Sequence, residues 1–195
     1  MFEALTGVGL AASAGLNAYI PLLVVALLGR FTDLITLPSA WVWMENGWVI
    51  GILSVLLAVE VVADKVPAVD SVNDVVQTVV RPASGGLVFG AASASETVTV
   101  SDPGDFFASN RWVPIVAGVV ISLVVHGAKA TARPVMNVAT VGVAAPVVST
   151  AEDATSLVMS FVAIVLPILI LVFLFALFGG FVWLRDRRRR PTGAA

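Results

Sequence analysis

The stretch EVVADKVPAVDSVNDVVQTVVRP, residues 60–82, concentrates charged residues in a chain that is otherwise mostly apolar. Hydrophobic residues make up 58% of the 195 residues and charged residues only 12%, and the mean hydropathy is +0.99. Such values lie far outside the range of soluble domains. The composition therefore predicts an all-α integral membrane protein, with one transmembrane domain over residues 1–195 that ends in a basic tail at residues 185–195.

The residue types that are missing narrow the chemistry. The chain has no cysteine, which excludes disulfides, thiolate metal sites and cysteine nucleophiles. A single histidine excludes a multi-histidine metal centre within one chain, and a net charge of -2 with scattered basic residues gives no footprint for nucleic acid. We expect no catalytic residue, no metal, no cofactor and no nucleic-acid partner.

The first apolar run, residues 4–29, is long enough to cross roughly 30 Å of hydrocarbon at about 1.5 Å per residue. The triplet at residues 12–14 resembles a signal-peptidase site, but Glu3 replaces the usual positive region, so we expect an uncleaved first span. Asn17, Tyr19 and Pro21 lie between its small-residue half and its bulky half. Because Pro21 removes a backbone hydrogen bond, we expect a kink or break there.

The second span is expected from Trp48 to about residue 63, with Glu60 one turn inside the end marked by Asp64 and Lys65. A charge within a membrane span is costly and is often functional. After a proline, Asp70 is well placed to cap a short amphipathic helix that continues to about residue 80. We expect this helix to lie on the cytoplasmic membrane surface.

That surface helix carries Asp74 and ends at Arg81, and the following apolar segment, residues 83–95, is too short to span alone. It contains the close-packing motif Gly86-x-x-x-Gly90, which is common in membrane helices.

The next span is expected at residues 112–128, with His126, Lys129 and Arg133 along one helix face. A second short segment interrupted by glycine and proline follows at residues 134–150 and contains Asn137. Residues 149–152 then read as a capping box that opens the last helix, in which Glu152 and Asp153 form the acidic first turn. In total we expect about six crossing or partly crossing helices.

A weak internal repeat relates the two halves. Lys129 follows Trp112 at the same distance as Lys65 follows Trp48, and each lysine is followed by an Arg-Pro pair. Internal repeats of this kind are common in transporters.

Six crossings with both termini in the cytoplasm place nine basic residues inside and only Arg30 and Arg111 outside. The nine are Lys65, Arg81, Lys129, Arg133 and the five tail arginines. The positive-inside rule favours this orientation. The acidic pair at 152–153 is then predicted to lie outside.

Three motifs, DKVPAVDSVNDVVQTVVRPASG at residues 64–85, GLNAYIPLL at 15–23 and APVVSTAED at 145–153, resemble domain-of-unknown-function family 4126, a family of bacterial multi-span integral membrane proteins. The resemblance covers nearly the whole chain, implies a location in the bacterial inner membrane and brings no activity with it. It singles out Asp64, Lys65, Pro67, Asp70, Asp74, Arg81 and Pro82, and later Pro146, Ser149, Glu152 and Asp153. One departure is VAAP at residues 143–146, where we expect an asparagine before the proline.

The intramembrane charges favour a transporter or channel-like protein for a small polar solute or ion. Glu60 and Asp64 share a helix face, and His126, Lys129 and Arg133 are candidate partners. The alternative is a buried ion-pair network that only holds helices together, within a non-catalytic protein that binds membrane lipid or serves as a scaffold.

A third and weaker hypothesis is an enzyme that acts on lipid phosphates through Asp70, Asp74 and Arg81. The glycine-rich faces also favour a homodimer.

Overall fold

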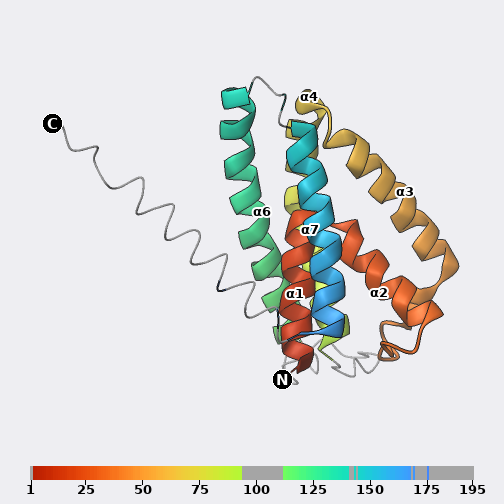
Figure 1. Ribbon diagram of the computed structural model, residues 1–195. Coiled ribbons are helices and arrows are strands. Elements are labelled where there is room, and N and C mark those ends of the chain that lie inside the picture. Colours follow the sequence, from red (N-terminus) through yellow and green to blue (C-terminus); the bar gives the residue numbers. More distant parts are fainter. Residues whose placement is uncertain are drawn as a thin grey trace.

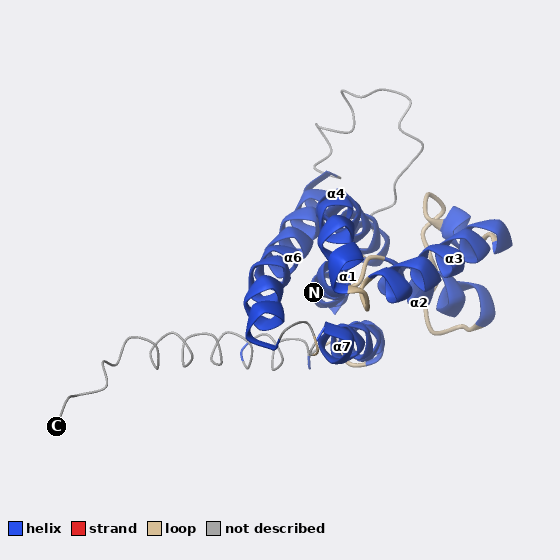
Figure 2. Cartoon of the chain, turned by 90° about the horizontal axis from the view of Figure 1, so that it is seen from above, coloured by secondary structure: helices blue, strands red, loops and turns tan. Residues whose placement is uncertain are grey.

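Figure 1 shows the computed structural model of the chain, which describes residues 2–93, 112–140, 143, 145–167, 169 and 175. The described part contains six α-helices, one short 3-10 helix and no strand. They are α1 (Phe2–Leu16), α2 (Tyr19–Phe31), η1 (Val42–Glu45), α3 (Gly47–Ala63), α4 (Pro67–Ala92), α6 (Trp112–Thr140) and α7 (Ala145–Val165). The view in Figure 2 shows α1, α4, α6 and α7 clustered together, with α2 and α3 to one side.

The predicted first span is two helices that meet at a sharp break. The side chain of Asn17 accepts hydrogen bonds from the amides of Tyr19 (3.0 Å) and Ile20 (3.1 Å), which caps the start of α2. Pro21 lies in the first turn of α2, where its missing N–H costs little. The break is therefore confirmed, and it lies four residues before the proline.

The helix α3 matches the second predicted span closely. Its first turn is capped by the side chain of Asn46, which accepts from the amide of Trp48 at 2.9 Å. Its end at Ala63 leaves Glu60 one turn inside the helix, as predicted.

The prediction of a surface helix capped by Asp70 and followed by a separate short segment is wrong. Instead α4 runs without interruption from Pro67, in the first turn, through Pro82. In its first half two polar side chains face the protein: Gln77 is 2% exposed and Arg81 is 0% exposed. Valines of the same half face outward, with Val75 71% exposed and Val79 74% exposed.

Two further boundaries differ from the prediction. The helix α6 continues past Pro134 to Thr140, so the residues after Arg133 begin no new segment. The last helix, α7, begins at Ala145, which places Ser149 and Glu152 inside it rather than in a capping box. The start of α7 is packed, since Ala145 and Ser149 are buried, whereas the part of α6 after Pro134 is mostly exposed.

Small residues bring α4 and α6 into close contact. A Cβ atom on Gly86 would lie 2.9 Å from the side chain of Val119, and one on Gly118 would lie 2.6 Å from Phe89 Cβ. The close-packing motif is therefore confirmed, with Gly90 fitting against Trp41 and Ile115. These glycines are used within the chain, and the homodimer stays a prediction.

Hydroxyl groups join α1 to α7 on the other side of the bundle. Ser13 Oγ lies 2.8 Å from Ser156 Oγ and 2.7 Å from Ser160 Oγ, and all three side chains are buried. Nearer the N-terminus, Thr6 donates to the carbonyl oxygen of Ala163 at 2.9 Å. These contacts hold α1 at the centre of the bundle.

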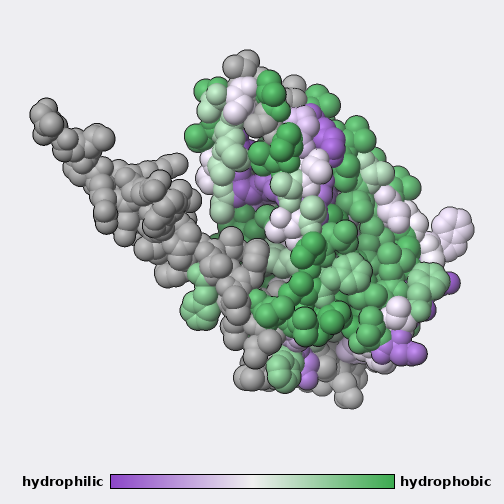
Figure 3. Space-filling model, viewed as in Figure 1, coloured by the Kyte–Doolittle hydropathy of each residue, from purple (hydrophilic) through white to green (hydrophobic). Residues whose placement is uncertain are grey.

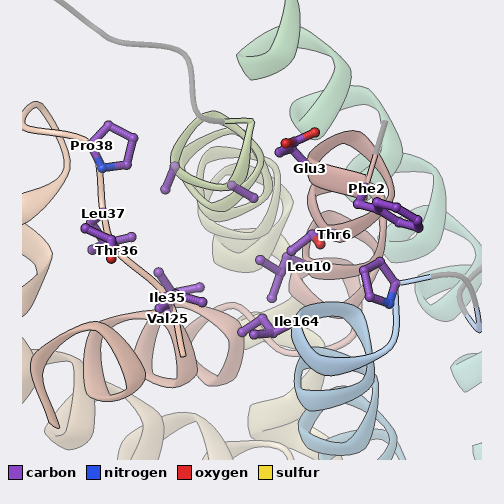
Figure 4. A pocket seen from close by; sticks show the side chains of 13 residues that line it. Phe2, Glu3, Thr6, Leu10, Val25, Ile35, Thr36, Leu37, Pro38 and Ile164 are labelled. Atoms are coloured by element: carbon purple, nitrogen blue, oxygen red, sulfur yellow. The ribbon is translucent and has the colours of Figure 1, made fainter. Parts of the chain in front are cut away.

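One end of the bundle gathers the start of α1, the loop after α2, and the ends of α4 and α7. A cavity of about 310 Å³ at this end is lined by residues from all four, including Phe2, Thr36, Ala92 and Ile164 (Figure 4). The junction of α3 and α4 lies at the opposite end (Figure 1). The start of α1 and the α3–α4 junction therefore lie at opposite ends of the described bundle, because α1 and α2 form a hairpin that returns to the end where it began. The membrane side of each end stays a prediction.

The predicted repeat is not reflected in the path of the described residues. The chain reverses between Lys65 and Pro67, whereas α6 passes straight through Lys129. What the halves share is an Arg-Pro pair inside a helix, Arg81-Pro82 in α4 and Arg133-Pro134 in α6.

Two helices of the described part, α6 and α7, are long and apolar enough to cross a membrane, and α1, α2 and α3 are apolar but shorter. Figure 3 shows hydrophobic side chains over most of the visible face, with hydrophilic side chains between α6 and α7 in its upper half.

Candidate functional site

Six charged side chains from four helices meet inside the bundle, near the junction of α3 and α4. This charge cluster consists of Glu60 and Asp64 at the end of α3, Arg81 of α4, Lys129 and Arg133 of α6, and Glu152 of α7. Five of its members are buried, and the Glu152 side chain is 15% exposed. Glu152 is thus the member that reaches furthest toward the outside.

Asp64 is the centre of the cluster. Its Oδ2 atom lies 3.4 Å from the ammonium of Lys129, 3.4 Å from Arg133 and 3.7 Å from Arg81. Its Oδ1 atom accepts a 2.7 Å hydrogen bond from Nδ2 of the Asn73 side chain. One carboxylate therefore collects three cations from two helices, which is the pairing that a buried charge requires.

Glu60 is held by Arg81. The guanidinium donates to Glu60 Oε1 at 3.0 Å, and both side chains are almost wholly buried. Arg81 also contacts His126 Nδ1 at 3.2 Å through its other terminal nitrogen. Arg81 therefore connects both acidic residues of α3 to α6.

This contact determines the tautomer of His126. Because arginine can only donate, His126 Nδ1 must accept, and the ring proton lies on Nε2. Nε2 then donates to the hydroxyl of Thr78 at 3.1 Å, and Thr78 donates to the carbonyl oxygen of Asp74 at 2.8 Å. His126 is accordingly neutral and acts here as a hydrogen-bonding link between α6 and α4.

Lys129 links the charge cluster to the break between α1 and α2. Its ammonium donates to the carbonyl oxygen of Leu16, the last residue of α1, at 3.0 Å, and lies 3.1 Å from Glu152 Oε2. Glu152 also forms a close ion pair with Arg133. A helix end carries partial negative charge on its free carbonyl groups, so a lysine is a favourable partner there.

Asn17 joins the same region from the other side of the break. Its Nδ2 atom donates to Asp153 Oδ1 at 2.9 Å, and Asn17 is fully buried. The acidic pair predicted to lie on the opposite side of the membrane from Lys129 and Arg133 instead lies beside them. That part of the six-crossing topology is wrong.

One predicted residue, Lys65, lies outside the charge cluster. Lys65 does not provide the partner of Asp64 in the cluster; its ammonium donates to the carbonyl oxygen of Val61 at 3.1 Å. Asp70 and Asn137 belong to the backbones of α4 and α6, and their side chains lie outside the described part of the structure. The trio proposed for lipid phosphate is wrong in one respect, because Arg81 turns into the bundle toward Glu60.

Three polar residues of the site were not predicted: Asn73, Gln77 and Ser122. Asn73, Gln77 and Arg81 are spaced by four residues, which places them on one face of α4. Ser122, which donates to the carbonyl oxygen of Arg81 at 2.8 Å, is likewise four residues before His126. This four-residue spacing of polar side chains is the sequence feature that could have predicted their place in the site.

The described residues contain no group of three His, Asp or Glu side chains that could hold a metal ion. Asp64, the most highly coordinated carboxylate, is already surrounded by cations of the chain itself. What the cluster offers chemically is a set of buried charges that can exchange partners.

The chain belongs to the family described as Domain of unknown function (DUF4126), whose model matches residues 4–187. This confirms the resemblance noted in the sequence. No curated protein matches the chain, and no solved structure does.

Proposed function

We propose that this protein spans the bacterial inner membrane and moves a small polar solute or ion past the charge cluster. The observation that carries the proposal is the burial of six charged side chains from four helices beside a broken helix. Ionisable groups inside membrane bundles and broken helices near them are features of substrate and ion pathways.

The inverted polarity of α4 supports a membrane environment. In water an amphipathic helix turns its apolar face inward. Here Val75 and Val79 face outward while Gln77 and Arg81 face inward. This polarity suits a helix whose outer face contacts lipid. The outward residues of α3, including Trp48 and Val55, are also apolar.

Glu152 suggests where a solute enters the site. It is the most exposed member of the charge cluster and touches both Lys129 and Arg133. The hydrophilic patch between α6 and α7 in Figure 3 lies on an otherwise apolar face. An entrance between these two helices would lead to Asp64 and, through Arg81, to Glu60.

The positive-inside rule supports an orientation with the Lys65 end of the bundle in the cytoplasm. The opposite end carries Glu3, Asp33 and Glu45 against one basic residue, Arg30, among the described residues. In this orientation residue 2 faces the outer side of the membrane.

The test is a flux assay on purified protein in liposomes, with gradients of H⁺, Na⁺, K⁺ and Cl⁻ as separate probes. We expect the wild type to carry at least one probe and Glu60→Gln to lose most of that flux. Glu45→Gln is the matched control, because Glu45 lies at the other end of the bundle and outside the cluster. Equal flux in the wild type and Glu60→Gln would contradict the assignment.

A second candidate is a structural role without transport. It is favoured by the extent of pairing, since both oxygens of Asp64 have partners and Glu60 is held by a buried arginine. In that case no probe moves in the wild type, and Glu60→Gln changes only the stability of the folded protein.

A further inference from the structure

Two buried oxygen atoms next to the charge cluster have no hydrogen-bond donor. They are Glu60 Oε2, the carboxylate oxygen that Arg81 leaves free, and Gln77 Oε1. Both residues are 2% exposed. Buried polar atoms are almost always paired, so each of these acceptors calls for a donor that the surrounding side chains do not supply.

The two residues lie in one compartment, formed by α2, α3 and α4. Gln77 is one turn before Arg81 on the same face of α4, and Arg81 holds the other oxygen of Glu60. Tyr19 of α2 lies near Gln77 and within electrostatic range of both Glu60 and Arg81. Glu60 and Gln77 are therefore both neighbours of Arg81, one by ion pair and one along the helix.

A water molecule, a cation or a proton can each satisfy two acceptors at once, and only the proton also makes the buried Glu60 side chain neutral. A bound metal ion would need several more oxygen ligands, and the positive guanidinium of Arg81 is only 3.0 Å from Glu60 Oε1. A proton needs no further ligand. As a carboxylic acid, Glu60 still accepts from Arg81 through Oε1 while Oε2 carries an O–H group that can donate.

We propose that Glu60 is a proton-binding site in which the protonated Oε2 donates to the amide oxygen of Gln77, and that this proton is the coupling ion of the transport proposed above. The binding step takes one proton from water and converts the carboxylate into the neutral acid. The coupling part rests on the proposed function, whereas the proton site itself does not.

Arg81 is the group that transmits the change. It is shared between Glu60 at 3.0 Å and Asp64 at 3.7 Å. When a proton neutralises Glu60, Asp64 is the remaining anion within reach of Arg81. Asp64 then has a stronger third partner, and its hold on Lys129 and Arg133 at 3.4 Å weakens in favour of Glu152. Binding of a proton at Glu60 thus changes the ion pairs that Lys129 and Arg133 form with Glu152.

Charged and titratable groups surround Glu60 on every element packed against it. They are Asp64 on its own helix, Tyr19 on α2, Arg81 on α4, and Lys129 on α6, with His126 reached through Arg81. Because His126 accepts from Arg81, its protonation would also disturb this arrangement. The test must therefore observe the carboxyl group itself.

Infrared difference spectroscopy of the full-length protein in lipid, recorded while the pH is changed, detects the carbonyl stretch of a protonated carboxylic acid. We expect the wild type and Glu45→Gln to show this band, shifted in heavy water, and Glu60→Gln to lose it. Gln77→Met removes the proposed acceptor, so the Glu60 band should move to higher frequency as its hydrogen bond is lost.

Asp153→Asn serves as a second control, because Asp153 is a half-buried carboxyl group that could also titrate. The Glu60 band should persist in this variant. A spectrum of Glu60→Gln identical to that of the wild type would overturn the proton site, as would a band whose frequency is unchanged by Gln77→Met. Glu60→Asp keeps a carboxyl group at this position, so a carboxylic-acid band should remain in this variant. Loss of the band in both variants would instead indicate that the substitutions disturb the fold.

The failure of the coupling role has its own signature. If the band behaves as expected but a pH gradient drives no flux of any probe in liposomes, the proton site stands and the coupling is overturned. If flux occurs but the spectrum of Glu60→Gln still contains the carboxylic-acid band of the wild type, transport stands and the proton site is overturned.

Discussion

The ammonium of Lys129 lies 3.0 Å from the carbonyl oxygen of Leu16, so a lysine in the middle of α6 binds the open end of α1. The same ammonium lies 3.1 Å from Glu152 of α7. Through this single group the charge cluster is joined to the helix break, and a change in the pairing of the cluster reaches the α1–α2 hairpin directly.

Asn17 is predicted to be essential for the helix break because it has two roles, capping α2 and binding Asp153. Asn17→Ala should lower the free energy of unfolding by about 1–3 kcal/mol, the cost of leaving buried partners unpaired. Asn17→Asp keeps the cap but places a second carboxylate beside Asp153, so its stability should rise as the pH falls and one of the two is protonated.

Thermal unfolding in detergent at several pH values measures both effects. The matched control is Asn46→Asp, since Asn46 caps α3 in the same way at an exposed position. An acidic residue is favourable at a helix start, so this variant should be nearly as stable as the wild type. Equal pH dependence of the two aspartate variants would contradict the role of Asp153.

Arg81 is predicted to stabilise the bundle by compensating Glu60. Arg81→Met should destabilise the protein by about 3–5 kcal/mol, because it leaves a buried carboxylate without its partner. The double variant with Glu60→Gln should recover much of that loss, and a double-mutant cycle on unfolding free energies measures the coupling. Strictly additive losses would show that the pair is not coupled.

The close contact of α4 with α6 predicts different outcomes for two glycines. Gly118→Val should destabilise by about 1–3 kcal/mol or more, because its side chain would meet the backbone of Gly85 and the Cβ atom of Phe89. Gly51→Ala has nothing within 4 Å of the added atom and should stabilise α3 by about 0.5–1 kcal/mol. Melting temperatures of the two variants, measured together, should fall for Gly118→Val and rise for Gly51→Ala. Equal melting temperatures would contradict the close contact.

The absence of cysteine makes the topology directly testable. Single cysteines at Phe2 and Ser39 should be labelled by an impermeant maleimide from one side of the membrane, and those at Val66 and Val143 from the other. All four positions are exposed. Labelling of positions 2 and 66 from the same side would restore the six-crossing arrangement and contradict the hairpin.

Sequence patterns predicted those features that depend on local chemistry. The bounds of α3, the position of Glu60 and the shared face of His126, Lys129 and Arg133 were all predicted from residue spacing. Proline was the main source of error. Pro82 and Pro134 both lie inside long helices. At Pro82, which is buried, helix–helix packing outweighs the loss of one backbone hydrogen bond, whereas Pro134 is exposed and the structure gives no such reason there.

The composition of the charge cluster was predicted better than its pairing. Glu152 matched a capping-box pattern and was therefore placed at a helix start on the far side of the membrane, away from Lys129. Length alone also could not distinguish a crossing helix from a hairpin at Asn17. Long-range contacts decide both, and single-sequence spacing carries no information about them.

The hydrogen bond between Asn17 and Asp153 joins residues that are 136 positions apart. The ribosome therefore completes the α1–α2 hairpin long before the helices that surround it, α4, α6 and α7, have been made. Until then the side chain of Asn17 lacks Asp153, its partner in the folded protein. We expect the earliest helix to be the last to settle, and variants at Asn17 to be degraded more often while the chain is still folding.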